Sequence, residues 1–132
     1  MKKKVVFVCI ENSNRSQMAQ AFAIMHASGF VESFSAGSHP SGRINPRAIA
    51  TMKELGYDLS THASKAVNEL PLVEFDYVIG MGCGDNCPTI RAHHRLEWQI
   101  PDPRHMEEEE FRAVRDLIEQ KVKELIKNIK EG

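Results

Sequence analysis

An apolar strand that runs at once into a polar loop and a helix start constrains this chain more than any other feature. Residues 4–8 form a β-rich run in which only Lys4 is polar, which predicts a buried strand. Cys9 ends the run, a mostly polar loop follows over residues 10–14, and the alanine- and methionine-rich residues 17–27 predict a helix. A strand, a tight loop and a helix N-terminus in this order form an anion site, because the free first-turn N–H groups and the helix dipole point at the loop.

Cys9 and Arg15 carry the chemistry of this loop. The field of the helix favours the thiolate of Cys9, which is the form that attacks an electrophile. Arg15 offers a planar fork of donors that fits two oxygens of a tetrahedral anion. A cysteine six positions before an arginine also occurs by chance, and many free cysteines are small buried hydrophobic residues. We favour the catalytic interpretation, because Cys9 leaves its strand into a loop of Asn, Ser and Arg residues.

Length and charge exclude several classes of protein. A chain of 132 residues predicts one domain over residues 1–132, large enough for a hydrophobic core. The formal net charge of −1 gives no reason to expect a nucleic acid or a membrane as partner. No apolar segment has the length of a bilayer span or the form of a secretory signal. Three cysteines, an odd number, indicate a reducing compartment, so we expect a cytoplasmic protein, and we expect a monomer.

Helices and strands alternate along the remaining chain. Helices are predicted over residues 16–28, 46–55 and 107–129, and strands over residues 31–36, 76–81 and 95–100, with a further short strand within 60–65. This alternation predicts a parallel, doubly wound α/β sheet. Ligands of such sheets bind at the carboxyl ends of the strands, where Cys9, the loop 83–87 and Asp102 would meet.

The same segments resemble a known family. The C-x5-R-S pattern of residues 9–16 and the Asp102-Pro103 pair are similar to the low-molecular-weight protein tyrosine phosphatases. Residues 15–19 (RSQMA), 35–37 (SAG) and 81–88 (MGCGDNCP) are closer to the arsenate reductases built on that fold. The resemblance covers nearly the whole chain. It implies a Rossmann-like three-layer α/β sandwich, in which helices flank a short parallel sheet.

The resemblance also implies roles for individual residues. Cys9 would be the nucleophile and Arg15 the oxyanion clamp, and Ser16 would hydrogen-bond the Cys9 thiolate. Asn12 would hold the shape of the loop, since asparagine tolerates unusual backbone angles. Asp102 would be the general acid; the plainer alternative is a turn aspartate before a proline. The oxyanion would be bound by residues of the loop and the first helical turn: Ile10, Glu11, Asn12, Ser13, Asn14, Arg15 and Ser16.

Two positions near the loop depart from the family pattern. Glu11 stands where many relatives have glycine, so we expect its carboxylate to point outward and to weaken oxyanion binding. Some thioredoxin-linked reductases have a cation site near the loop, but its acidic positions correspond here to Gln20 and Lys65. We therefore expect no such cation site, no other metal and no cofactor.

The redox loop departs from the pattern as well. The related reductases use two cysteines in this loop, and Cys87, before Pro88, matches the distal one. The proximal position corresponds to Gly82, which leaves Cys83 one residue late. We expect Cys87 to take part in the thiol relay and Cys83 to replace the missing proximal thiol.

The leading hypothesis is the reduction of arsenate to arsenite. Cys9 would attack arsenic, and a second thiol would release arsenite by forming a disulfide with Cys9. That thiol would be Cys83 or Cys87, or belong to thioredoxin, glutaredoxin or a low-molecular-weight thiol. The alternative is a phosphatase that hydrolyses phosphate monoesters through a phosphocysteine. A zinc-binding or oxyanion-sensing module, with His93 and His94 beside the two loop cysteines, is less favoured because the spacing is poor for zinc.

Overall fold

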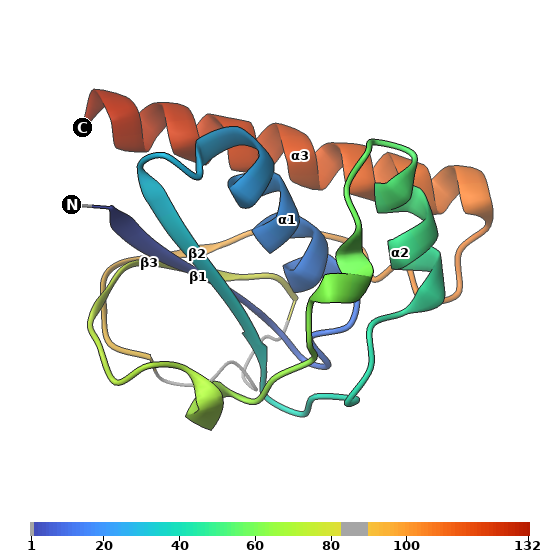
Figure 1. Cartoon of the computed structure of the whole chain (residues 1–132), viewed down its shortest axis with the longest axis horizontal. Helices are drawn as coiled ribbons and strands as arrows, with labels where there is room; N and C mark the ends of the chain where they lie inside the picture. Colours follow the sequence, from blue (N-terminus) through green and yellow to red (C-terminus); the bar gives the residue numbers. More distant parts are fainter. Residues whose placement is uncertain (1, 83–89) are drawn as a thin grey trace.

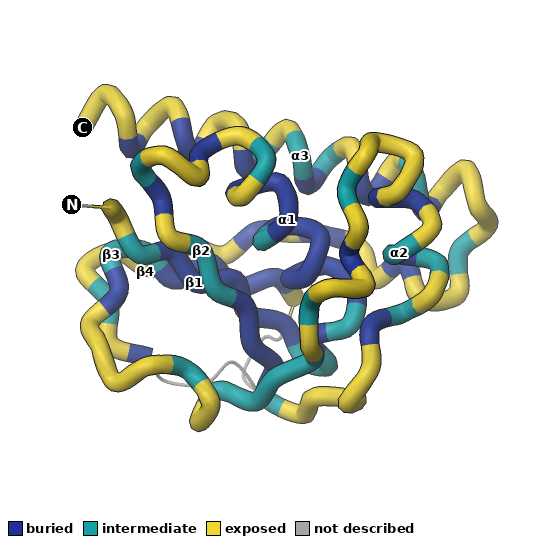
Figure 2. The backbone as a smooth tube through the Cα atoms, viewed as in Figure 1, coloured by how far each residue is buried: buried dark blue, intermediate teal, exposed yellow. Residues whose placement is uncertain are grey.

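A parallel sheet forms the centre of the computed structural model, which describes residues 2–82 and 90–132 (Figure 1). Its strands are β1 (Lys3–Cys9), β2 (Val31–Gly37), β3 (Phe75–Gly80) and β4 (Ala92–Glu97), in the spatial order β2-β1-β3-β4. All neighbouring strands are parallel. β1 lies inside the sheet, and its last five residues are buried, as the dark tube of Figure 2 shows. The apolar run of residues 5–8 therefore forms the buried strand that its composition predicts.

Three helices pack with this sheet: α1 (Arg15–Ala27), α2 (Pro46–Lys53) and α3 (Glu108–Glu131). α1 and α3 cover one face, and their side chains form a core with β1 in which Phe7, Phe22 and Phe111 are fully buried. The opposite face is packed by a smaller cluster that includes Val67, from the short 3-10 helix η2 (Val67–Glu69). The predicted three-layer α/β fold is confirmed.

The structure corrects two predicted elements. The short strand expected within residues 60–65 is absent: residues 60 and 61 belong to the 3-10 helix η1 (Leu59–Thr61), where the side chain of Asp58 caps the N–H of Ser60, and residues 62–65 form neither helix nor strand. The last strand covers Ala92–Glu97 instead of residues 95–100. Among the described strands, β4 lies at the edge and pairs only with β3, and most of its side chains are exposed. The apolar residues that suggested a later strand, Trp98 and Ile100, are buried just after the strand ends.

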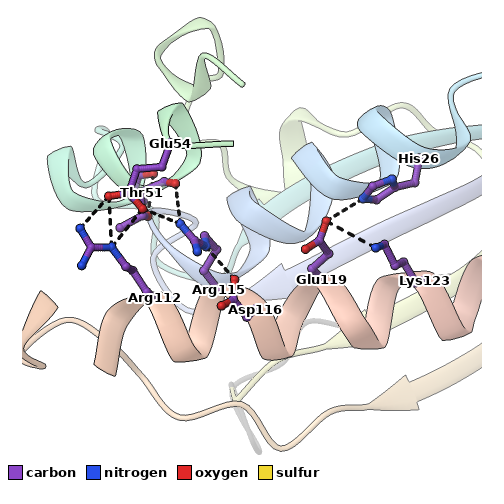
Figure 3. A network of polar contacts seen from close by, with 9 residues as sticks. His26, Thr51, Glu54, Arg112, Arg115, Asp116, Glu119 and Lys123 are labelled. Atoms are coloured by element: carbon purple, nitrogen blue, oxygen red, sulfur yellow. Dashed lines mark hydrogen bonds and ion pairs between the residues drawn. The ribbon is translucent and has the colours of Figure 1, made fainter. Parts of the chain in front are cut away.

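Ion pairs join α3 to the other two helices (Figure 3). The buried Arg115 donates to the backbone oxygen of Thr51 (2.9 Å) and to the carboxylate of Glu54 (2.7 Å). Arg112 donates to the same carboxylate at 2.7–3.1 Å. The hydrogen bonds from Arg112 and Arg115 lower the pKa of Glu54 from 4.5 to about 2.

Among the described residues, no helix combines the length and the hydropathy that a bilayer span requires.

Candidate active site

Cys9 lies at the carboxyl end of β1, and two hydrogen-bond donors converge on its sulfur. The side chain is buried, with 3% of its surface exposed. Its Sγ accepts from the backbone N–H of Asn12 (3.3 Å) and lies 2.8 Å from Oγ of Ser16. Nδ2 of Asn12 donates to that same Oγ (2.8 Å), which leaves the hydroxyl proton of Ser16 free to point at the sulfur. Donors aimed at a sulfur stabilise its anionic form.

Asn12 gives the loop its bend. Its φ of 52° lies in the left-handed region, which asparagine tolerates better than most residues. The side chain is fully buried, and its Oδ1 accepts from Nε2 of Gln17 (2.8 Å) and from the backbone N–H of Lys65 (2.8 Å). These contacts hold the left-handed backbone in place, one from the first turns of the following helix and one from a segment 53 positions away.

The segment after β2 turns the carbonyl oxygens of the loop outward. Backbone N–H groups of this segment donate to four of them: Ser38 to Cys9 (3.2 Å), His39 to Ile10 (2.8 Å), Ser41 to Glu11 (3.1 Å) and Asn45 to Ser13 (3.1 Å). In a trans peptide the N–H points opposite to the C=O, so the N–H groups of these peptide units point away from the segment after β2, and that of Asn12 donates to the sulfur of Cys9. Such a ring of N–H groups is an anion-binding cradle.

Gly37 permits the close approach of β2 to this loop. A Cβ atom at Gly37 would come within 2.5 Å of the backbone oxygen of Ile10. A contact this short would push the loop away from the strand. The glycine of the SAG motif therefore has a packing reason that the sequence alone did not reveal.

Arg15 opens α1 and places its guanidinium between two other segments. The residue is 8% exposed, and its Nη1 donates to the backbone oxygen of Ile100 (3.0 Å). Nη2 lies 4.0 Å from Oδ2 of Asp102. A Cβ atom at Gly82, whose φ is 87°, would come within 2.2 Å of Nη1. Cys9, Arg15 and Asp102 thus meet at one site, as the sheet topology predicts; their catalytic roles stay predictions.

These residues line a pocket of about 480 Å³ with polar and charged walls. Its lining consists of Cys9, Ile10, Glu11, Ser13, Asn14, Arg15, Ser41, Arg43, Asn45, Pro46, Asp102 and Arg104. No aromatic ring is among the described residues of this wall. The cations and hydrogen-bonding groups of this lining suit an oxyanion.

Glu11 lies at the rim of the pocket, where it meets Arg104. Its Oε2 accepts from Nη1 of Arg104 at 2.5 Å, and its side chain is 39% exposed. The backbone N–H of Arg104 donates to Oδ1 of Asp102 (3.0 Å). The carboxylate that was expected to weaken oxyanion binding is therefore paired with a cation of the Asp102 segment.

Several residues of this site were missed from the sequence. Arg104, Arg43 and the serine and asparagine of segment 41–45 reach the pocket through the fold, and no local pattern marked them. Gln17 belongs to the RSQMA motif, but nothing in the sequence indicated that its side chain holds Asn12. His62, which bonds Gln17, lies in no recognised motif.

Other predicted positions lie away from the pocket or outside the described residues. Cys83 and Cys87, the cysteines of the predicted thiol relay, lie in segment 83–89, outside the residues that the structure describes. His93 and His94 lie on the edge strand β4. Gln20 bonds Ser33 and Ser35 of β2 through its amide. Within residues 2–82 and 90–132, no three His, Cys, Asp or Glu side chains gather as a metal site would require.

Comparisons with known proteins agree with this geometry. Residues 4–132 match the sequence model of the low molecular weight phosphotyrosine protein phosphatases. A glutaredoxin arsenate reductase of Synechocystis sp. is 39% identical over 96% of this chain and 98% of its own. Arsenate reductase 2 of Staphylococcus saprophyticus is 37% identical over 96% of this chain and 98% of its own. A solved structure of an arsenate reductase in the phosphate binding state superimposes with a TM-score of 0.88 at 38% identity, over 96% of this chain and 98% of that one.

Proposed function

The chain belongs to the low molecular weight phosphotyrosine protein phosphatase family, and from that premise we propose that it reduces arsenate to arsenite, with Cys9 as the nucleophile. One observation carries the proposal: the sulfur of Cys9 accepts a backbone hydrogen bond from its own loop and lines a pocket that Arg15 and Asp102 also line. The relatives named arsenate reductases, similar over nearly the whole chain, support arsenate as the oxyanion.

The first step forms a sulfur–arsenic bond. The thiolate of Cys9 attacks arsenic, the bond from arsenic to a hydroxyl oxygen breaks, and this hydroxyl takes a proton from Asp102 and departs as water. Arg15 and the N–H groups of the loop bind the remaining oxygens and stabilise their charge. Arsenic is still pentavalent in this adduct.

The second step transfers two electrons. A thiolate attacks the sulfur of Cys9, a disulfide forms, and the electron pair of the sulfur–arsenic bond stays with arsenic, which leaves as trivalent arsenite. We propose that either Cys83 or Cys87 is the internal source of this thiolate and that the two cysteines form the relay pair. An external dithiol or small thiol then reduces the disulfide; the name of the Synechocystis relative makes glutaredoxin with glutathione one candidate, beside thioredoxin.

Hydrolysis of phosphate monoesters is the second candidate, because a cradle for arsenate also fits a phosphoryl group. A phosphatase would use water in place of the second thiol. The described residues of the pocket wall include the cations of Arg43 and Arg104 and no aromatic side chain that could stack on a phenyl ring. This favours a free inorganic oxyanion over a phosphotyrosine side chain.

Turnover with separate reductants tests the proposal. Reduced protein is given arsenate together with thioredoxin, with glutaredoxin plus glutathione, or with a small thiol alone, and arsenite is measured. We expect the wild type to turn over with at least one of these reductants. Cys9→Ser should be inactive. Arg15→Lys should be nearly inactive, since a point charge cannot replace the bidentate fork of the guanidinium. Hydrolysis of aryl phosphate without arsenate reduction would instead establish the phosphatase.

Serine variants test the internal relay. One equivalent of arsenate added to reduced protein should give one intramolecular disulfide, mapped by mass spectrometry to Cys9, Cys83 or Cys87. If Cys83→Ser and Cys87→Ser both turn over normally with a small thiol, Cys9 works with an external reductant alone.

We also propose that residues 1–132 form one domain that acts as a cytoplasmic monomer. The packing of α1 and α3 on the same sheet supports the single domain. Thiol chemistry requires a reducing compartment, which supports the location. Light scattering at several protein concentrations tests the monomer.

A further inference from the structure

A chain of hydrogen bonds approaches the loop from the side away from the pocket. Oη of Tyr57 lies 2.6 Å from Nε2 of His62, and Nδ1 of His62 lies 2.9 Å from Oε1 of Gln17. Nε2 of Gln17 donates to Oδ1 (2.8 Å) and to the backbone oxygen (3.1 Å) of Asn12. From there, Asn12 and Ser16 lead to the sulfur of Cys9.

The partners of Gln17 show which atom donates and which accepts in each of these hydrogen bonds. Its Nε2 faces three oxygen acceptors, the two of Asn12 and the backbone oxygen of Ala63 (2.9 Å), so this atom is the amide nitrogen. Its Oε1 must then accept, and Nδ1 of His62 must carry the proton. In the neutral imidazole Nε2 is left as an acceptor for the hydroxyl of Tyr57.

Every link therefore donates toward the sulfur. Tyr57 donates to His62, which donates to Gln17, and the amide of Gln17 donates to Asn12. The last two links run from Asn12 to Ser16 and from Ser16 to Cys9. Aligned hydrogen bonds polarise one another in a low-dielectric interior, so a donor at the far end strengthens the one at the sulfur.

The charges around His62 keep the imidazole neutral. Burial lowers the pKa of His62, and the nearby cation of Lys65 lowers it further. Burial raises the pKa of Tyr57, and the carboxylate of Asp58 adds to this, so the phenol keeps its proton. A protonated imidazole would carry a second N–H at Nε2 and would reverse the link to Tyr57.

We propose that His62 and Tyr57 are positioning residues, which orient a one-way chain of donors that ends on the Cys9 sulfur and thereby set the reactivity of the nucleophile. The inference rests on Cys9 being the nucleophile of the proposed function. It does not depend on which oxyanion the enzyme uses.

Alkylation of Cys9 measures this effect without any turnover. The full-length protein is treated with iodoacetamide across a range of pH, and the modified tryptic peptide of residues 5–15, which contains Cys9 as its one cysteine, is quantified by mass spectrometry. Only the thiolate reacts, so the midpoint of the rate profile reports how well the site stabilises it.

Four variants separate positioning from packing. His62→Leu removes the donor, and we expect the midpoint to rise by about half a pH unit to one unit, because the thiolate loses part of its hydrogen bonding. His62→Asn keeps an N–H at the place of Nδ1 but loses the acceptor of Tyr57, so it should leave only the smaller rise that is expected for Tyr57→Phe. Tyr57→Phe, which removes the first donor, should raise the midpoint by a smaller amount. His26→Leu removes a histidine of α1 that bonds Glu119 and takes no part in these hydrogen bonds, so it should leave the pH profile unchanged.

The outcomes decide the proposal. A wild-type profile for His62→Leu overturns it, and so do equal shifts for His62→Leu and His62→Asn at equal thermal stability, which would indicate packing alone. If His62→Leu does not fold, an unchanged midpoint in Tyr57→Phe overturns the proposal and a raised one supports it. Shifted profiles in a protein that reduces no arsenate would reject the proposed function and leave this inference standing.

Discussion

Glu11 and Arg104 form an ion pair across the rim of the pocket, with Oε2 and Nη1 2.5 Å apart. Glu11 belongs to the loop that cradles the oxyanion, and the backbone N–H of Arg104 donates to Oδ1 of Asp102. The pair therefore connects the two segments on which the proposed chemistry depends. The positive charge of Arg104 also neutralises the negative charge of Glu11, which would otherwise repel an anion in the pocket.

Removal of Arg104 should weaken the binding of arsenate. In Arg104→Met the charge of Glu11 is no longer paired, so we expect KM for arsenate to rise by roughly 3- to 10-fold at low ionic strength. The double variant Glu11→Gln with Arg104→Met should recover most of this loss, since no unpaired carboxylate remains. Steady-state kinetics of the wild type, Glu11→Gln, Arg104→Met and the double variant at two salt concentrations measure the coupling. An unchanged KM in Arg104→Met would contradict it.

Asp102→Asn distinguishes a role of Asp102 as proton donor from a role in the structure of its turn. The asparagine keeps a side-chain oxygen that can accept from the N–H of Arg104, so the turn should survive. The proton for the leaving oxygen is lost, and formation of the Cys9–arsenic adduct should slow by roughly 10²- to 10⁴-fold. Single-turnover measurement of the adduct tests this. An unchanged rate would leave Asp102 as a turn residue only.

Gly82→Ala should displace the guanidinium of Arg15. The added Cβ would lie 2.2 Å from Nη1 of Arg15, and the φ of 87° disfavours any side chain. We expect kcat/KM for arsenate to fall by at least about 10-fold, because the fork no longer faces the oxygens. The measurement is steady-state turnover beside thermal unfolding.

Gly56→Ala is the matched control for that variant. Gly56 has a similar φ of 85°, but a Cβ there meets nothing within 4 Å. This change should lower stability by about 1 kcal/mol or more through backbone strain and leave turnover unchanged. Equal losses of turnover in both variants would show that strain, and not contact with Arg15, causes the effect.

Local patterns made much of this protein predictable from its sequence. The strand that ends at Cys9 and the helix that begins at Arg15 adjoin in the chain, so their composition was enough to predict an anion site. The resemblance to the family supplied Asp102. The edge strand β4 was misplaced because its side chains are polar and exposed, and an edge strand need not show an apolar run.

The remaining features depend on contacts between distant segments. Arg104 meets Glu11 from 93 positions away, and His62 meets Gln17 from 45. Neither pair lies within one helix or strand, so no periodicity reveals it. The role of Gly37 against Ile10 likewise depends on how closely β2 passes the loop. Such tertiary contacts complete the site, and a single sequence does not specify them by pattern.

Acid should remove the contribution of Glu54 to stability. Hydrogen bonds from Arg112 and Arg115 lower the pKa of this carboxyl from 4.5 to about 2 in the folded protein (Figure 3). The unfolded chain therefore takes up the proton first, and stabilisation that is complete above about pH 4.5 is lost as the pH falls toward 2. Glu54→Gln should be less stable than the wild type at pH 6, and the difference should shrink toward pH 2.5. Urea unfolding across this range measures it, with Glu124→Gln, on the exposed side of α3, as the control. A difference that stays constant with pH would show that Glu54 is not held ionised by the two arginines.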